Sequence, residues 1–163
     1  MFKYEEHLGY LLLGFLLFFS FAVVTTYIVP EISAQNIKET AETVHYTDQQ
    51  NAGRQIYMRE GCVWCHSQVV RTGEENLATF FRRGEIGSVT TPAWYAAQNP
   101  VLIEQHRRGP DLSHVWTRWP SITWQKMHFQ NPEQLNPGTW MPPFSYLSDK
   151  DQDDLLAYLQ TLR

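Results

Sequence analysis

The chain has 163 residues and a net charge of −4, with 13 lysines and arginines against 17 aspartates and glutamates. Its length suffices for one domain of about 100–150 residues with an additional segment. The excess of acidic residues argues against a nucleic-acid partner, because binding to phosphates favours a basic protein surface. Aromatic residues make up 14% of the chain, a proportion that suits either the walls around a large flat ligand or a compact aromatic core.

The first predicted element is a membrane-spanning helix near the N-terminus. Residues 8–29 carry no formal charge and are rich in leucine, phenylalanine and valine. As a helix these 22 residues would rise about 33 Å, close to the ~30 Å thickness of the hydrocarbon core of a bilayer. Tyr10 and Tyr27 lie near the two ends, where aromatic belts occur, and Pro30 and Glu31 are expected to end the helix.

A cleaved signal peptide is the competing interpretation of this segment. Such peptides usually have an apolar region of about 7–15 residues behind a positively charged start. Here the apolar run is longer, and two glutamates outnumber Lys3 before it. We therefore predict an uncleaved anchor over residues 1–30, a polar tether over residues 31–46 and one domain over residues 47–163.

Helices are predicted in the domain, and no strand pattern competes with them. The first helix begins near Thr47, which can form a capping box with Gln50, and ends at Gly61. The second runs from Ser121, a good N-cap residue, to about Gln130, before an Asn-Pro pair. The chain is therefore predicted to be all-α.

The last predicted helix is capped by Ser148, and aspartates near its start are favourable to the helix dipole. Its apolar face consists of Leu155, Leu156, Tyr158, Leu159 and Leu162. Between the first and second helices, residues 71–110 contain many glycines and prolines, so we expect mostly loop there, with one or two short helical turns. A long stretch of this kind inside a compact domain is usually functional.

Residues 62–66 read Cys-Val-Trp-Cys-His and carry the chemistry of the chain. A C-x-x-C-H run is the attachment sequence of a c-type haem. Cys62 and Cys65 would form thioether bonds with the two haem vinyl groups, and His66 would bind the iron as the proximal ligand. The chain contains only these two cysteines. The sequence therefore predicts one covalently bound haem c.

Other interpretations of the two cysteines are weaker. A redox-active dithiol would be expected within a βαβ pattern, which the sequence lacks. A structural zinc site needs four ligands, and no second pair of cysteines or histidines stands at metal-binding spacing. A disulfide between residues three apart would close a strained, tight loop.

A methionine or a second histidine usually binds the other face of the iron in an electron carrier. Met141 is the predicted sixth ligand, because two prolines directly after it can hold an extended loop against the haem. Met127 lies in a predicted helix, where a methionine more often packs in the core. The remaining candidates are His106, His114 and His128. A thioether ligand raises the reduction potential, and iron bound on both faces passes electrons without an open position for catalysis.

The haem motif also predicts the orientation of the chain. Covalent haem attachment takes place on the outer side of energy-transducing membranes. We therefore expect a single-pass protein of the bacterial inner membrane, with the haem domain in the periplasm or its equivalent. The charges flanking the apolar segment give no independent indication, because lysines stand on both sides of it.

A longer pattern surrounds the haem motif and extends through most of the chain. It reads Gly53-Arg54-x-x-Tyr57-x-x-Glu60-Gly61-Cys62-x-x-Cys65-His66-Ser67-Gln68-x-x-Arg71, followed by Gly109-Pro110-Asp111-Leu112, Trp124, Asn131-Pro132 and Met141-Pro142. In this pattern the chain closely resembles the membrane-anchored mono-haem cytochrome c subunit of cbb3-type cytochrome c oxidases. The extension after the haem motif is much more specific than C-x-x-C-H alone.

The resemblance implies a class I cytochrome c domain behind a single transmembrane helix. By position, His66 and Met141 would be the axial ligands of the iron. The carbonyl of Pro110 would accept a hydrogen bond from the ring of His66 and fix its orientation. Gly53 and Tyr158 would meet where the first and last helices cross.

The resemblance also implies partners. The subunit would relay electrons to the catalytic subunit of a haem–copper oxidase, where oxygen becomes water. The donor would be a soluble cytochrome c or another cytochrome c subunit. The chain departs from the family at residues 104–106, where Glu-Gln-His replaces a Trp-Gly-Ser run whose serine is associated with a calcium site on the catalytic subunit, so the resemblance does not extend to a calcium role. The segment after the axial methionine is also shorter than the family generally has. The chain could therefore belong to a divergent oxidase or to a related complex.

Other functions share the same layout of anchor and haem domain. The chain could be the cytochrome c subunit of a nitric oxide reductase, although the extension after the haem motif favours the oxidase. It could also be a free-standing membrane-anchored electron shuttle. A haem-based gas sensor would need an output domain, for which the sequence gives no sign.

Overall fold

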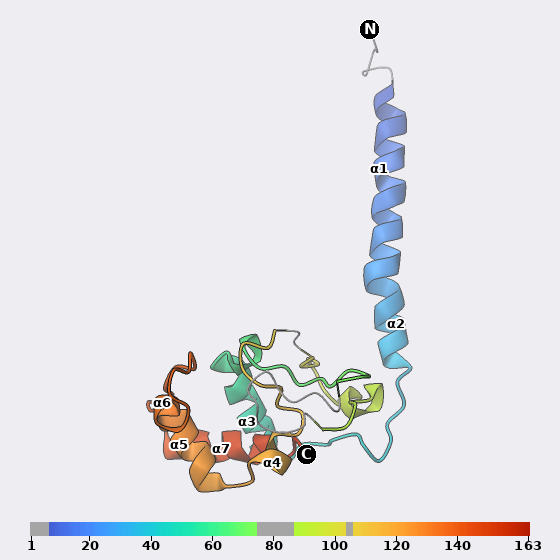
Figure 1. Cartoon of the computed structure of the whole chain (residues 1–163). Helices are drawn as coiled ribbons and strands as arrows, with labels where there is room; N and C mark the ends of the chain where they lie inside the picture. The colour runs from blue at the N-terminus through green and yellow to red at the C-terminus, as the bar shows by residue number, and fades with distance from the viewer. Residues whose placement is uncertain (1–6, 75–86, 104–105) are drawn as a thin grey trace. The chain divides into compact units, whose positions relative to one another are not determined.

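The computed structural model describes residues 7–74, 87–103 and 106–163. The chain divides into two compact units, Met1–Glu39 and Thr40–Arg163. Every regular element in the described residues is helical, which confirms the predicted all-α class (Figure 1).

The first unit contains one long apolar helix. It consists of α1 (Leu8–Val23), a π-helical turn (Val24–Ile28) and α2 (Val29–Gln35), which continue one another (Figure 1). The 28 residues from Leu8 to Gln35 are long and apolar enough to cross a membrane, and no side chain of α1 is buried within the protein. The position of the helix agrees with the predicted anchor.

The helix was expected to end at Pro30. It instead continues for five more residues, to Gln35. A proline inside an α-helix normally clashes with the carbonyl four residues earlier and removes one hydrogen bond. Here the wider π-helical turn lies directly before Pro30, where it relieves this clash. The hydroxyl groups of Thr25 and Thr26 donate hydrogen bonds to Phe21 O and Ala22 O, at 2.9 and 2.7 Å, which satisfies carbonyls beside the irregular turn. The first part of the expected tether is therefore helical.

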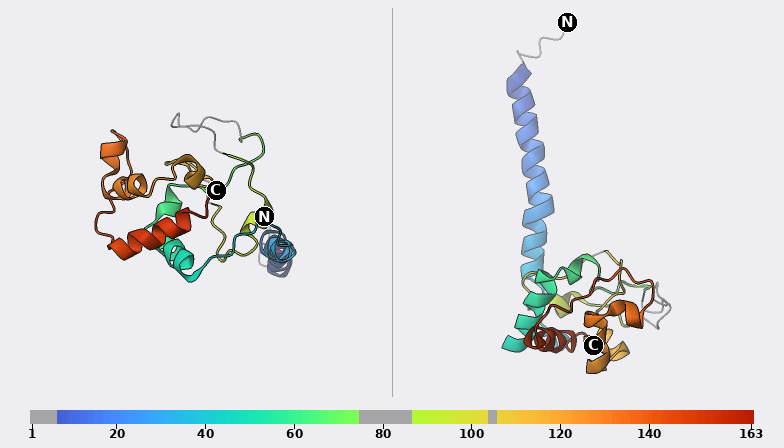
Figure 2. Two further views of the ribbon diagram at one scale, coloured as in Figure 1. Left: turned by 90° about the horizontal axis from the view of Figure 1, so that it is seen from below. Right: turned by 90° about the vertical axis from the view of Figure 1, so that its left-hand side faces the viewer.

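The second unit is built on two helices, α3 (Asp48–Arg59) and α7 (Asp149–Leu159), which pack on each other (Figure 2). Their N-termini are as predicted. Thr47 and Gln50 form the reciprocal capping box at the start of α3, and Ser148 Oγ accepts a hydrogen bond of 3.1 Å from the amide of Asp151 at the start of α7. The apolar face of α7 lies in the main core.

Gly53 lies at the contact between α3 and α7. A Cβ atom at this position would lie 1.8 Å from Asp154 O and 2.9 Å from Tyr158 Cβ. Only glycine allows the two backbones to approach this closely. Gly53 and Tyr158 thus meet at the helix crossing, as the resemblance implies.

Replacing Gly53 with alanine should therefore be strongly destabilising. The added methyl group meets backbone, which cannot move without separating the helices, so we expect the free energy of unfolding to fall by about 3 kcal/mol. Denaturant titration of the full chain in detergent, followed at the haem absorption, measures this change. Gln55→Ala is the matched control, because Gln55 is exposed on the same helix and its replacement should cost less than about 0.5 kcal/mol. Equal stabilities of the two variants would contradict the close helix contact.

Shorter elements complete the domain. The helix predicted from Ser121 to Gln130 is α5 (Ile122–Gln130), with Ser121 Oγ accepting a hydrogen bond from Trp124 N. Two one-turn helices were not predicted from the sequence, α4 (Val115–Arg118) and α6 (Pro132–Leu135). In the stretch 71–110, the described residues contain one short 3₁₀ turn, Pro92–Tyr95, in agreement with the expected loop. Residues 75–86 of that stretch, and the Glu-Gln pair at 104–105 where the chain departs from the family, lie outside the described residues.

Candidate haem site

The haem motif begins directly after α3. Gly61 ends the helix with a positive φ of 76°, a conformation that glycine adopts without steric cost, and Cys62–Trp64 then form a 3₁₀ turn. The amide of His66 donates a hydrogen bond of 3.0 Å to Cys62 O, which closes the loop. Both cysteines are free thiols and partly buried, and Cys62 packs against the main core. Burial raises the pKa of the Cys62 thiol to about 12, and the charge of Glu60 acts in the same direction.

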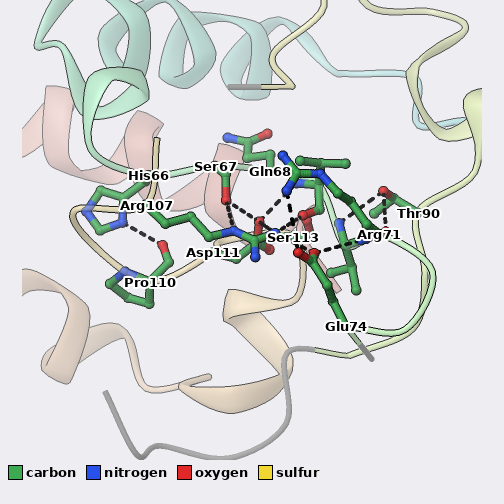
Figure 3. A network of polar contacts seen from close by, with 12 residues as sticks. His66, Ser67, Gln68, Arg71, Glu74, Thr90, Arg107, Pro110, Asp111 and Ser113 are labelled. Atoms are coloured by element: carbon green, nitrogen blue, oxygen red, sulfur yellow. Dashed lines mark hydrogen bonds and ion pairs between the residues drawn. The ribbon is translucent and has the colours of Figure 1, made fainter. Parts of the chain in front are cut away.

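The ring of His66 is oriented by a single strong contact. Its Nδ1 lies 2.8 Å from Pro110 O (Figure 3). A carbonyl oxygen only accepts hydrogen bonds, so Nδ1 must carry the proton, and Nε2 keeps the lone pair that a metal ion requires. Burial lowers the pKa of His66, while the contact with Pro110 and the charge of Asp111 act in the opposite direction. The imidazole is therefore neutral, which is the protonation state of a haem ligand.

Gly109 brings the backbone against the face of this ring. A Cβ atom at Gly109 would lie 2.3 Å from Cε1 and 2.6 Å from Nδ1 of His66. The amide of Gly109 donates a hydrogen bond of 2.8 Å to Cys65 O, which ties this segment to the motif. Gly109 and Pro110 thus cover and orient the imidazole from a distant part of the chain, since Pro110 stands 44 positions after His66.

Met141 lies in the loop before α7 and packs, partly buried, against the main core. The loop is fixed at two points. The amide of Phe144 donates a hydrogen bond of 2.7 Å to Phe129 O in α5, and Tyr146 Oη donates one of 2.6 Å to Glu60 Oε2, two residues before the haem motif. These contacts hold the Met141 loop close to the start of the motif.

The other candidates for the sixth ligand are placed differently. Met127 is exposed on α5 and does not pack in the core, contrary to the interpretation from the sequence. His106 is exposed as well. His114 is buried, with Nε2 2.9 Å from Ser88 O and its ring against Trp94, and the ring of His128 stacks on Trp124 in α5.

A buried guanidinium group gives the site a second feature that suits haem. Arg118 donates from Nη2 to Asp111 O, but its Nε and Nη1 are buried without a partner in the described part of the chain. Burial lowers the pKa of this guanidinium. Buried donors normally have acceptors, and the propionate carboxylates of a haem are acceptors of this kind. Two thiols, the free nitrogen of His66, the thioether of Met141 and this cation thus fit a haem c.

Among the described residues, no cluster of three or more histidine, cysteine or acidic side chains could hold a metal ion.

The two residues after the motif, Ser67 and Gln68, make contacts that were not predicted from the sequence. Ser67 Oγ donates a hydrogen bond of 2.6 Å to Asp111 Oδ2 (Figure 3). Gln68 is buried, its Oε1 accepts a hydrogen bond of 2.8 Å from Tyr158 Oη, and its carbonyl accepts one of 2.6 Å from Tyr95 Oη. The specific extension of the haem motif therefore connects it to α7 and to the segment that covers His66. The position of Ser67 and Gln68 in the extension of the haem motif was the only indication in the sequence that these two residues matter.

Together, the haem motif, the helical domain and the apolar helix define a membrane-anchored cytochrome c with a single haem c. A family model described as "Cytochrome C oxidase, mono-heme subunit/FixO" matches residues 2–162. The chain therefore belongs to the mono-haem subunits of cbb3-type cytochrome c oxidases, as the sequence comparison by motif predicted. The protein named cytochrome c oxidase subunit 2 of Alkalihalophilus pseudofirmus is 27% identical over 127 residues, which cover 78% of this chain and 28% of that protein. The chain thus spans less than a third of that relative's length.

Proposed function

We propose that the chain relays single electrons from a cytochrome c donor to the catalytic subunit of a haem–copper oxidase, where oxygen is reduced to water. The haem, when bound, supplies a one-electron iron couple. The observation that carries the proposal is the geometry of His66, whose Nδ1 is committed to Pro110 O so that Nε2 is available to the iron. Membership in the oxidase family supports the proposed partner.

The residues of the site would have distinct roles. Cys62 and Cys65 would hold the haem covalently, and His66 and Met141 would bind the iron from opposite faces. Pro110 orients the imidazole. With both faces of the iron bound, the domain would transfer electrons without binding oxygen itself.

We further propose that the haem domain faces the periplasm and that the apolar helix Leu8–Gln35 anchors it in the inner membrane. Support comes from the haem motif, because haem is attached covalently on the outer side of the membrane. Small and hydroxylated residues of the anchor, including Gly14 and the pair Thr25 and Thr26, would allow close contact with a helix of the catalytic subunit.

Purification of the complex through a tag on this chain tests the proposal. In mild detergent the chain should co-purify with a large membrane subunit, and the complex should consume oxygen with reduced cytochrome c as donor. A chain that migrates alone would instead be a free-standing shuttle. A complex that reduces nitric oxide and leaves oxygen unchanged would be a nitric oxide reductase. Either result would contradict the proposed function.

A further inference from the structure

Asp111 is a buried carboxylate directly after the residue that orients His66. Its side chain has no exposed surface. Oδ2 accepts hydrogen bonds from Ser67 Oγ at 2.6 Å and from Val69 N at 2.9 Å, and Oδ1 accepts one from Ser113 N at 2.8 Å (Figure 3). The amide of Leu112 also donates to Ser67 O, at 2.8 Å. Asp111 therefore joins the segment that follows His66 to the segment that contains Pro110.

Arg107 provides a positive charge beside this carboxylate. Its Nε donates a hydrogen bond of 2.8 Å to Ser67 Oγ, and its Nη2 lies 3.8 Å from Asp111 Oδ2. Nη2 also lies 2.8 Å from Glu74 Oε2, and this contact with Arg107 lowers the pKa of Glu74. The side chains of Arg107 and Glu74 are 25% and 18% exposed, so solvent screens them only partly.

Removing one member of a buried ion pair leaves an uncompensated charge in a low-dielectric surrounding. Such a charge acts over several ångströms, because the protein interior screens it much less than water does. Asp111 and Arg107 place their charges near His66, because Ser67 directly follows His66 in the sequence and Asp111 directly follows Pro110. The two charges thus lie next to both segments that hold the imidazole.

We propose that Asp111 is a positioning residue for His66, and that its negative charge, balanced by Arg107, sets the reduction potential of the haem. The proposal rests on ligation of the iron by His66. Iron gains a positive charge on oxidation, so a negative charge nearby favours the oxidised state and lowers the potential. Arg107 opposes this effect. Asp111 also holds the Pro110 carbonyl against Nδ1, which makes the imidazole a better donor and acts in the same direction as its charge.

Two variants with opposite expected signs test the proposal. Asp111→Asn keeps the shape of the side chain and removes its charge, so the potential should rise. Arg107→Gln removes the positive charge that lies 3.8 Å from Asp111 Oδ2, while Glu74 keeps its ion pair with Arg71 at 3.5 Å, so the potential should fall. For each we expect the redox equilibrium constant to change about tenfold, equivalent to about 59 mV for a one-electron couple. The potential is measured by redox titration of the haem-loaded full chain in detergent, and the double variant should lie between the single variants.

Two control variants distinguish the effect of the local charges on the potential from the effects of a lost hydrogen bond and of net charge. Ser67→Ala removes a hydrogen bond to the same carboxylate but no charge, and should shift the potential less than Asp111→Asn. Lys126→Gln removes a positive charge from the ion pair of 2.5 Å between Lys126 and Asp153, and should leave the potential unchanged. A shift with Lys126→Gln as large as that with Arg107→Gln would overturn the proposal, because net charge alone would then explain the effect.

The remaining outcomes of these experiments also support or overturn the proposal. Should Asp111→Asn yield no haem-loaded protein, Arg107→Gln decides alone, and an unchanged or raised potential in that variant overturns the proposal. An unchanged potential in Asp111→Asn with an intact spectrum overturns it as well. Failure of the proposed function is recognised separately, because a wild-type chain without histidine ligation would lack the low-spin c-type spectrum before any substitution is made.

Discussion

Replacing Met141 with alanine should leave the haem covalently bound and lower its reduction potential by more than about 100 mV, because a soft, neutral thioether ligand favours reduced iron. The haem should remain because Cys62 and Cys65 are unchanged. The weak near-infrared band that arises from sulfur bound to ferric iron should disappear. Redox titration and near-infrared absorption of the purified full chain measure both effects.

Met127→Ala is the matched control, since it removes the same side chain from an exposed position on α5. We expect this variant to keep the near-infrared band and the wild-type potential. Loss of the band in Met127→Ala and its retention in Met141→Ala would show that the ligand was assigned to the wrong methionine.

Replacing Cys62 or Cys65 with serine should sharply reduce the yield of haem-loaded protein. One thioether bond is lost, and a haem held through fewer covalent bonds depends more on the weak contacts of a small core. The haem that is incorporated should still resist extraction with acidified acetone, because the other thioether bond holds it. The pyridine haemochrome spectrum should shift as well, because one vinyl group remains unreacted.

Trp64→Phe tests whether this effect belongs to the thiols. Trp64 stands between the two cysteines, and 67% of its surface is exposed. Because its replacement leaves both thiols in place, the haem should stay covalently bound at near wild-type yield. A comparable loss in this variant would indicate that folding of the loop, and not the thioether bonds, limits haem incorporation.

Features that depend on neighbouring residues were predicted well from the sequence. The caps at Thr47, Ser121 and Ser148 are local hydrogen bonds between residues three apart, and all three form. The haem motif is local too, and its cysteines belong to the one haem c of the family.

Features that depend on distant contacts were not predicted by residue patterns alone. Ser67 and Asp111 are 44 positions apart, and no sequence pattern around either residue indicates that a hydrogen bond joins their side chains. The role of Gly109 became visible only once the ring of His66 was in place beside it. The end of the apolar helix was misjudged for another reason, because a proline ordinarily stops a helix and a π-helical turn is not visible in a sequence pattern.

The close contact between Gly109 and His66 has a consequence for the speed of electron exchange. An imidazole that is covered by backbone on one face and tied at Nδ1 has little freedom to turn or shift. If His66 binds the haem iron as proposed, this ligand would stay in place when the charge on the iron changes, and few atoms would have to move before the electron is transferred. A ligand that is already held in position keeps this rearrangement small. Preorganised dipoles have the same effect in enzyme active sites where charge develops during the reaction. Gly109 would thus contribute to rapid electron transfer although it offers no side chain to the iron.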